Sequence, residues 1–152
     1  MELSLLFSDK KTVHDDLTLR FADKDYVCDS YYLVIDRNLL PGREDAYKIR
    51  VVLRSLLAQW RNAVENVADG NNVYLPYDFS DQYTAWLRCS RSGDQVTLYR
   101  GWAELEGWAI SPSAIGDCIN DLPDFRPDGP CIEMSILKLI DAIQESYQRV
   151  SG

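Results

Sequence analysis

The chain has 152 residues, 46% of them apolar and 26% charged, and its 24 acidic against 16 basic side chains give a formal net charge of −8. This composition excludes an intrinsically disordered chain and two full-sized domains. It also argues against general nucleic-acid binding, because a negatively charged protein repels phosphate backbones. The N-terminal residues lack the features of a signal peptide, and no run approaches the ~18 apolar residues that span a bilayer. We therefore expect one cytoplasmic domain over residues 1–152, with neither membrane nor nucleic acid as a partner.

The sequence pattern in the first third of the chain predicts three short strands. Residues 2–7 form an apolar run, and the apolar residues Val13, Leu17, Leu19 and Phe21 then alternate with polar ones. Residues 31–36 (YYLVID) are rich in aromatic and β-branched side chains, which favour strands. We expect a strand from each of these segments, followed by a turn over residues 38–42.

The clearest element is a long helix after that turn. Apolar residues recur at three- and four-residue spacing from Ile49 to Val67, and they form one stripe across about five helical turns. The triplet Asp69-Gly70-Asn71 supplies a stop signal at the C-terminal end. This pattern predicts a helix that packs one face on the core.

A second group of strands follows the helix. Residues 73–79, 83–91 and 94–105 carry strand patterns, and the Ser92-Gly93 pair between the last two indicates a β-hairpin. Pro76 indicates an edge strand or a bulge, and Gly101 and Gly107 indicate bulges or bends.

The last part of the chain reads as two helices separated by a loop. Residues 111–113 (Ser-Pro-Ser) open a short helix, and residues 121–130, with three prolines and a glycine, predict a stiff loop. A final helix places apolar residues from Ile136 to Val150 on one side. The fold class expected is therefore α+β, a single domain in which an antiparallel sheet packs against a long central helix and a C-terminal helix.

Motifs that carry catalysis are missing from the sequence. The only histidine, His14, lies in an acidic stretch and is typical of a surface residue, and a single histidine rules out multi-histidine zinc sites. The four cysteines show no zinc-like spacing, and we expect them to be free thiols in a reducing cytosol, with two disulfides as the alternative. Phosphate-binding loops, dinucleotide fingerprints and nucleophile elbows are also missing. We expect a protein that is not an enzyme and that binds no cofactor or metal.

Two features point instead to a protein-binding surface. Eight of the seventeen aromatic residues fall within residues 74–108, and tyrosine and tryptophan are favoured at interfaces. Between Ala103 and Glu133 seven acids face one base, Arg126, so this segment carries −6 of the net charge of −8. A concentrated negative field speeds association with a basic protein. The expected partner-binding residues are Trp102, Glu104, Glu106, Trp108, Asp117, Asp121, Asp124 and Asp128, and strict alternation would place Trp102, Glu104 and Glu106 on one face.

Other interpretations of the same residues stay open. The aromatic sheet can simply cover the long helix, and the acids can serve solubility. Glu104 and Glu106, roughly 7 Å apart on one strand, could act as the carboxylate pair of a small hydrolase or ligand-binding domain with an aromatic-lined cleft. Exposed rings could also bury each other in a symmetric dimer, so the oligomeric state is left open. A deep pocket with converging carboxylates of perturbed pKa would favour the hydrolase, and a flat or convex acidic face would favour the binding protein.

Two blocks of the sequence carry a resemblance. Residues 73–89 (VYLPYDFSDQYTAWLRC) and 101–113 (GWAELEGWAISPS) look like a pattern of small bacterial proteins. Together with the size, the acidity and the lack of catalytic residues, they resemble the immunity proteins of bacterial toxin systems. The resemblance implies a protein that binds a cognate toxin, often a basic nuclease, and blocks its active site. Immunity proteins are structurally diverse, so the resemblance assigns no role to individual residues.

Overall fold

The N-terminal apolar runs form a three-stranded antiparallel sheet in the computed structural model, which describes residues 3–151. Its strands are β1 (Leu3–Phe7), β2 (Leu17–Phe21) and β3 (Lys24–Cys28), in the order β1-β2-β3. The first strand expected over residues 2–7 is confirmed from Leu3 onward, and residue 2 lies outside the described residues. The second strand begins only at Leu17, because Val13 lies in the preceding loop with a positive φ of 58° that ends any extended run.

The strand expected over residues 31–36 is wrong, because this segment forms the short helix α1 (Tyr31–Val34). Local hydrogen bonds explain the difference. The Asp29 carboxylate accepts from the Tyr31 N–H at 3.1 Å, and the Ser30 carbonyl accepts from the N–H groups of Leu33 and Val34. Such side-chain and backbone bonds at the start of a turn outweigh the strand preference of aromatic and β-branched residues.

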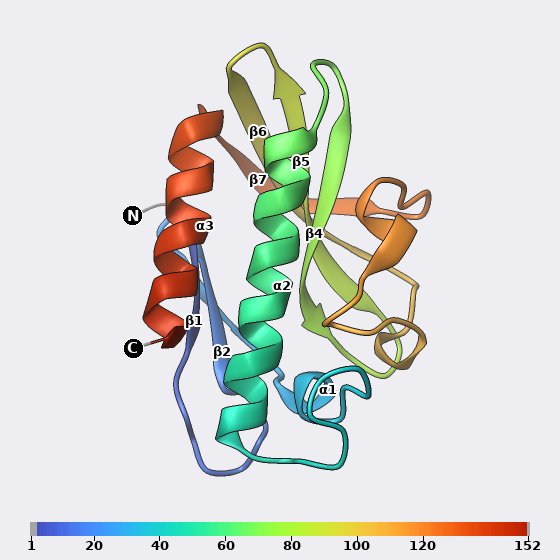
Figure 1. Cartoon of the computed structure of the whole chain (residues 1–152). Helices are drawn as coiled ribbons and strands as arrows, with labels where there is room; N and C mark the ends of the chain where they lie inside the picture. Colours follow the sequence, from blue (N-terminus) through green and yellow to red (C-terminus); the bar gives the residue numbers. More distant parts are fainter. Residues whose placement is uncertain (1–2, 152) are drawn as a thin grey trace.

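The expected long helix is confirmed as α2 (Ala46–Asn66). It begins at the N-cap Asp45, whose side chain accepts from the Lys48 N–H at 3.0 Å. Its apolar stripe, from Ile49 to Val64, is buried. The C-terminal helix α3 (Ile136–Ser151) packs beside α2 and against β1. Both helices lie on one side of the sheets, with α2 in the middle of the molecule (Figure 1).

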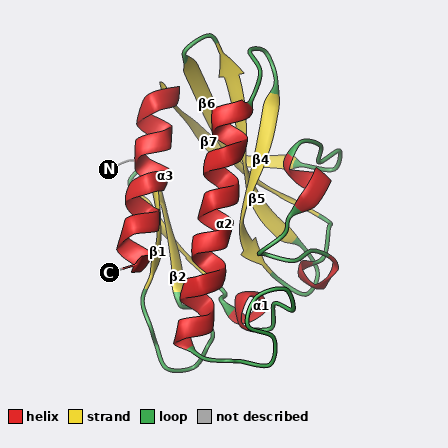
Figure 2. Cartoon of the chain, in the orientation of Figure 1, coloured by secondary structure: helices red, strands yellow, loops and turns green. Residues whose placement is uncertain are grey.

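The strands after α2 form a second sheet, so the single expected sheet is in fact two. Its strands are β4 (Asn72–Phe79), β5 (Thr84–Ser92), β6 (Gln95–Ala103) and β7 (Arg126–Ser135), all antiparallel and in sequence order. Figure 2 shows these strands behind α2, with the loops and short helices of residues 104–125 to one side. The edge strand and the bulge predicted from Pro76 are both confirmed, because β4 is an edge strand and its register shifts between Pro76 and Asp78. The bulge at Gly101 is confirmed by a register shift against β7.

Two expectations for the C-terminal half need correction. The loop expected over residues 121–130 ends at Phe125, because Arg126 to Pro130 belong to β7, in which Arg126 and Pro127 pair with Trp102 and Gly101 at the end of β6. An edge strand tolerates prolines, since the nitrogen that lacks a proton can face solvent. The short helix expected after Ser111 is only the 3₁₀ turn η2 (Gly116–Ile119), and a separate 3₁₀ turn, η1 (Gly107–Ala109), precedes Ser111.

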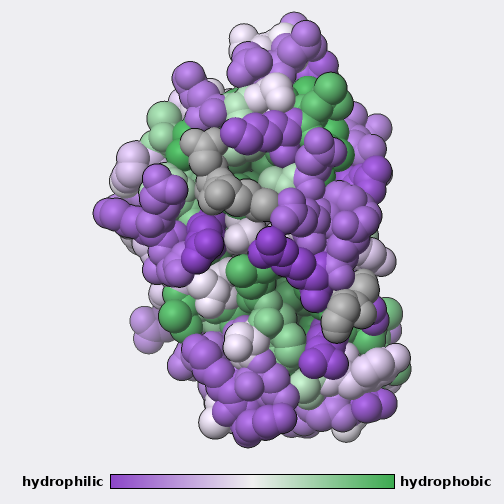
Figure 3. Space-filling model, turned by 90° about the vertical axis from the view of Figure 1, so that its left-hand side faces the viewer, coloured by the Kyte–Doolittle hydropathy of each residue, from purple (hydrophilic) through white to green (hydrophobic). Residues whose placement is uncertain are grey.

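The α+β class is confirmed, with a core between the two helices and the two sheets. The largest fully buried side chains include Trp60 of α2 and Trp86 of β5. On the side of α3 the surface is mostly hydrophilic, and apolar side chains gather in its lower half (Figure 3). Among residues 3–151, no helix combines the length and the apolar character that crossing a membrane requires.

Candidate functional site

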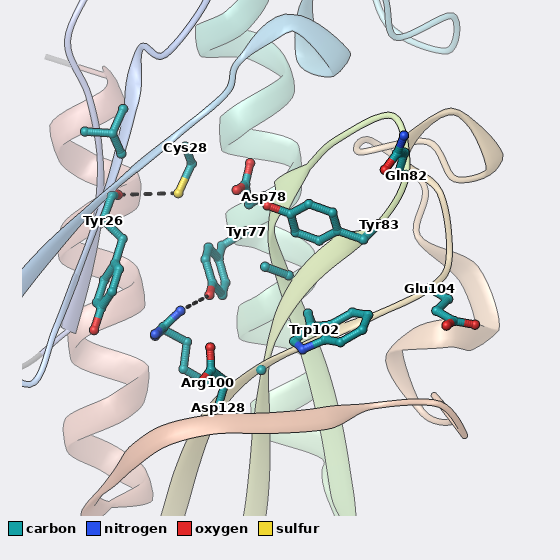
Figure 4. A pocket seen from close by; sticks show the side chains of 13 residues that line it. Tyr26, Cys28, Tyr77, Asp78, Gln82, Tyr83, Arg100, Trp102, Glu104 and Asp128 are labelled. Carbon is teal, nitrogen blue, oxygen red and sulfur yellow. Dashed lines mark hydrogen bonds between the residues drawn. The ribbon is translucent and has the colours of Figure 1, made fainter.

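A hollow of about 650 Å³ lies between β3 of the first sheet and strands β4 to β6 of the second (Figure 4). We call it the aromatic hollow, because four of the side chains that line it are rings. These are Tyr26, Tyr77, Tyr83 and Trp102. Charged lining residues are Asp78, Arg100, Glu104 and Asp128.

Two irregularities in the second sheet build this hollow. The register shift between Pro76 and Asp78 brings the consecutive residues Tyr77 and Asp78 to it, although regular alternation would send them to opposite faces. The second shift lies next to Arg100, between Tyr99 and Gly101 in the pairing of β6 with β7. The site therefore forms where the regular pairing of β4 with β5 and of β6 with β7 is interrupted.

Arg100 connects the two sheets inside the hollow. Its guanidinium carbon lies 4.0 Å from the centroid of the Tyr26 ring, and its Nη1 donates to the Tyr77 hydroxyl at 3.4 Å. Burial raises the pKa of Tyr77 well above its usual value, so this hydroxyl stays neutral. Arg100 thus contributes one fixed positive charge, and its ring contact joins β3 to β6.

Asp78 is the carboxylate of the hollow whose pKa is clearly raised. Burial raises its pKa to about 6, the nearby Asp29 and Asp15 carboxylates push in the same direction, and the hydrogen bond from the Asp29 N–H at 3.2 Å opposes them. Asp78 is therefore largely ionised at pH 7 and largely neutral at pH 5. Burial also raises the pKa of the neighbouring Cys28 thiol to about 12, so this thiol is not a nucleophile at neutral pH.

At the outer end of the hollow, Trp102 and Glu104 hold a guanidinium group. The guanidinium carbon of Arg126 lies 4.9 Å from the Trp102 ring centroid, and its Nη2 lies 3.7 Å from Glu104 Oε1. Tyr83 meets the Trp102 ring edge-on at 6.4 Å between centroids. An aromatic face beside a carboxylate is a favourable place for an arginine or lysine side chain.

The carboxylates of the hollow do not converge on one point. Asp78, Glu104 and Asp128 lie at separate positions around it in Figure 4, with Glu104 at the outer edge and Asp128 near Arg100. With Arg126 counted beside Glu104, three acids and two arginines leave the hollow with a net charge of −1 at neutral pH. The arrangement does not aim two carboxyl groups at one bond as glycoside hydrolysis requires.

The structure separates the eight residues that the sequence singles out. Trp102, Glu104 and Asp128 line the aromatic hollow. Glu106 accepts from the Trp108 indole N–H at 2.6 Å, and Trp108, which is 66% exposed, lies on a second hollow of about 380 Å³. The expected shared face of Trp102, Glu104 and Glu106 is wrong beyond the strand, because β6 ends at Ala103 and alternation ends with it.

The three remaining acids, Asp117, Asp121 and Asp124, are exposed in the segment between β6 and β7. Asp117 lies in η2, and Asp121 lines a third hollow between η2 and α2. The ion pairs found between described side chains do not include these three carboxylates. The acidic segment therefore keeps its negative charge, but it is spread over more than one hollow.

Several residues of the hollow are not among those expected from the sequence. Arg100 carried a usable signal, because it alternates with Trp102 on one strand. The tyrosines belong to the aromatic cluster that the sequence shows, although nothing assigns them individually. Asp78 carried no signal, since its burial depends on the bulge in β4 and on the packing of β3 against it.

The lone histidine lies outside the aromatic hollow. His14 is exposed, its ring stacks on Tyr31 with centroids 5.0 Å apart, and its Nδ1 lies 3.1 Å from Asp29 Oδ1. Across residues 3–151, no group of three or more histidine, cysteine or acidic side chains is arranged to hold a metal ion.

The comparisons with protein-family models, with curated proteins and with solved structures gave no match.

Proposed function

We propose that this chain is a non-enzymatic binding protein that neutralises a basic toxin domain, as a bacterial immunity protein does in the cytoplasm. The observation that carries the proposal is the contact of Arg126 with Trp102 and Glu104, which shows that this surface accommodates a guanidinium. In the complex, an arginine or lysine of the toxin enters the aromatic hollow beside Trp102.

Charge and ring content both support this proposal. The hollow pairs aromatic walls with three carboxylates, and rings flanked by acids hold cationic side chains through cation–π contacts and charge-assisted hydrogen bonds. The exposed and unpaired acids Asp117, Asp121 and Asp124 extend the negative surface beyond the hollow. A nuclease toxin has basic residues that hold phosphates, and the acidic segment would occupy the place of those phosphates.

The experiment uses the basic protein encoded by the adjacent reading frame as the probe. Its expression alone is expected to stop growth, and co-expression of this chain is expected to restore it. A Tyr83→Ala, Trp102→Ala double variant should lose protection, and Leu137→Ala, which removes an exposed apolar side chain of α3, should keep it. Binding by both variants with equal affinity would overturn the proposed site. A neighbour that does not bind this chain at all would overturn the proposed function.

A second candidate function rests on Asp78. An acid whose pKa is raised to about 6 in an aromatic-lined hollow could act as a proton donor in a small hydrolase or hold a sugar-like ligand. Titration with neutral oligosaccharides, followed by tryptophan fluorescence, tests it. Saturable quenching that Asp78→Asn weakens would favour this candidate over the binding protein, and unchanged fluorescence at millimolar sugar would eliminate sugar binding.

A further inference from the structure

The outer edge of β4 is open at two residues. Arg91 donates its N–H to the Asn71 carbonyl at 3.0 Å, and Asn72 lies opposite Ser90, so 72 and 90 are a pair without mutual hydrogen bonds. In such pairs the N–H and C=O groups of both residues point away from the partner strand. By the same alternation, Tyr74 turns both groups away from β5, and Pro76, which has no N–H, turns its carbonyl away.

The contact at Pro76 confirms this alternation. Its carbonyl accepts from the Trp60 indole N–H of α2 at 2.9 Å, which places the carbonyl on the side opposite to β5. The outward groups of Asn72 and Tyr74 have no such partner: within residues 3–151, neither backbone forms a hydrogen bond beyond those of the sheet itself. Two alternate residues of the edge strand therefore present free donors and acceptors.

The third hollow, between η2 and α2, lies along this edge and has a volume of about 1070 Å³. We call it the amide groove. Its walls are the C-terminal half of α2, residues 67–74 and residues 116–121. Amide side chains line it, namely Gln59, Asn62, Asn66, Asn71, Asn72 and Asn120. Gln59 already bonds to Ser55, Pro112 and Ile115 through both ends of its amide, so the asparagines are the groups that can donate to and accept from the polar backbone of a bound chain. Among the described lining residues the single charged side chain is that of Asp121, so the groove favours a basic segment over an acidic one.

We propose that an extended segment of a partner protein lies in the amide groove and adds a strand beside β4 at Asn72 and Tyr74. An extended chain offers one N–H and one C=O on the same edge at every second residue, which is the spacing that these two residues present. Open strand edges pair readily with other chains, and the groove gives this edge walls that select for one extended segment. The proposal does not depend on the aromatic hollow, and the occupant it names is an extended, basic segment, because Asp121 is the one charged side chain among the described lining residues.

A blocked peptide of alternating threonine and lysine, six residues long, is the probe. In ¹⁵N-labelled protein we expect the amide signals of Asn72 and Tyr74 to shift on titration and their hydrogen exchange to slow. The same peptide N-methylated at every residue keeps its side chains but cannot donate, and it should bind at least fivefold more weakly. Equal binding of the two peptides, or no shift at either residue at millimolar peptide, would overturn the proposal.

Two variants at one position separate the backbone from the side chain. Asn72→Pro removes an outward N–H without removing a bond to β5, and it is expected to weaken the peptide about fivefold, the effect of one hydrogen bond. Asn72→Ala keeps the N–H and should stay within about twofold. Trp102→Ala should leave peptide binding unchanged. Loss of toxin binding in Trp102→Ala and loss of peptide binding in Asn72→Pro therefore report on different sites.

Discussion

Arg126 lies over the ring of Trp102, with its guanidinium carbon 4.9 Å from the ring centroid and its Nη2 3.7 Å from Glu104 Oε1. The two residues face each other across the β6–β7 pairing. The protein thus places an arginine of its own where we propose that the toxin places a cationic side chain. In the free protein, this contact covers one face of the ring and compensates the charge of Glu104.

The first prediction concerns this internal competitor. Arg126→Ala frees Trp102 and Glu104 and makes the net charge more negative by one, so we expect it to bind the basic toxin several-fold more tightly. Arg126→Lys keeps the charge without the planar stacking group and should show a smaller change. Titration calorimetry at fixed ionic strength measures both. Weaker binding by Arg126→Ala would show that Arg126 helps to hold the partner instead of competing with it.

The second prediction concerns a lysine in the core. Lys48 of α2 is fully buried, and its Nζ donates to the carbonyls of Asp36, Leu40 and Arg43 at 2.7, 3.1 and 3.4 Å. Because Lys48→Met leaves these carbonyls without a donor, we expect it to lower the free energy of unfolding by about 2–4 kcal/mol.

Denaturant unfolding measures this loss, and Lys10→Met, at an exposed position, is the control that should change stability by less than about 0.5 kcal/mol. Hydrogen exchange over residues 36–43 should rise in Lys48→Met and stay unchanged in the control. Equal stability of the two variants would mean that the loop carbonyls find water instead.

The third prediction concerns the pH dependence that Asp78 introduces. Its pKa is raised from 3.8 to about 6 by burial, so the folded protein takes up a proton between pH 7 and pH 4 that the unfolded chain takes up only near pH 4. The contribution of Asp78 to stability therefore increases as the pH falls through 6. At pH 7.5 the ionised, buried group costs about 1–3 kcal/mol.

Asp78→Asn keeps an oxygen that can accept from the Asp29 N–H and removes the charge. It should be more stable than the wild type by about 1–3 kcal/mol at pH 7.5, and this advantage should shrink toward zero at pH 4.5. Urea unfolding at the two pH values measures the difference, with Asp124→Asn as an exposed control. An advantage that does not depend on pH would contradict the raised pKa.

The fourth prediction concerns the four free cysteines. Burial raises the pKa of both Cys28 and Cys89 to about 12, whereas Cys131 of β7 is exposed. A thiol reagent at pH 8 should react rapidly with Cys131 and reach Cys28 and Cys89 only after unfolding. Cys131→Ser should lose the fast phase. Rapid reaction of two or more thiols in that variant would show that the core opens readily.

Much of the fold follows from periodicity, because burial of one stripe or one face leaves a regular pattern in the sequence. The stripe of α2 and the turn at Ser92-Gly93 are such patterns, and both elements form as expected. Tyr31 to Val34 form a helix because Asp29 and Ser30 supply hydrogen bonds at its start, and these depend on a loop geometry that alternation does not encode. The same holds for Arg126, which pairs with β6 although prolines follow it.

The candidate site was harder to predict, because it forms at irregularities. Trp102 and Glu104 were visible as a ring beside an acid, but the strand ends between them, and their common role depends on Arg126. Gly101 marks the place: a Cβ there would lie 2.3 Å from the Arg126 carbonyl oxygen, so only glycine lets β7 approach this closely. Asp78 reaches the hollow through a bulge, which a two-residue alternation assigns to the wrong face.

The association rate of this chain with the basic toxin domain tests the central claim most directly. The test variant combines Glu104→Lys with Asp128→Lys, and the control combines Glu44→Lys with Asp141→Lys. Both double variants change the net charge by the same amount, and the control residues are exposed on the α1–α2 loop and on α3. If the aromatic hollow attracts the partner, the first variant should associate at least tenfold more slowly at low salt, and the control should lose much less. Equal rates for the two double variants would contradict the account.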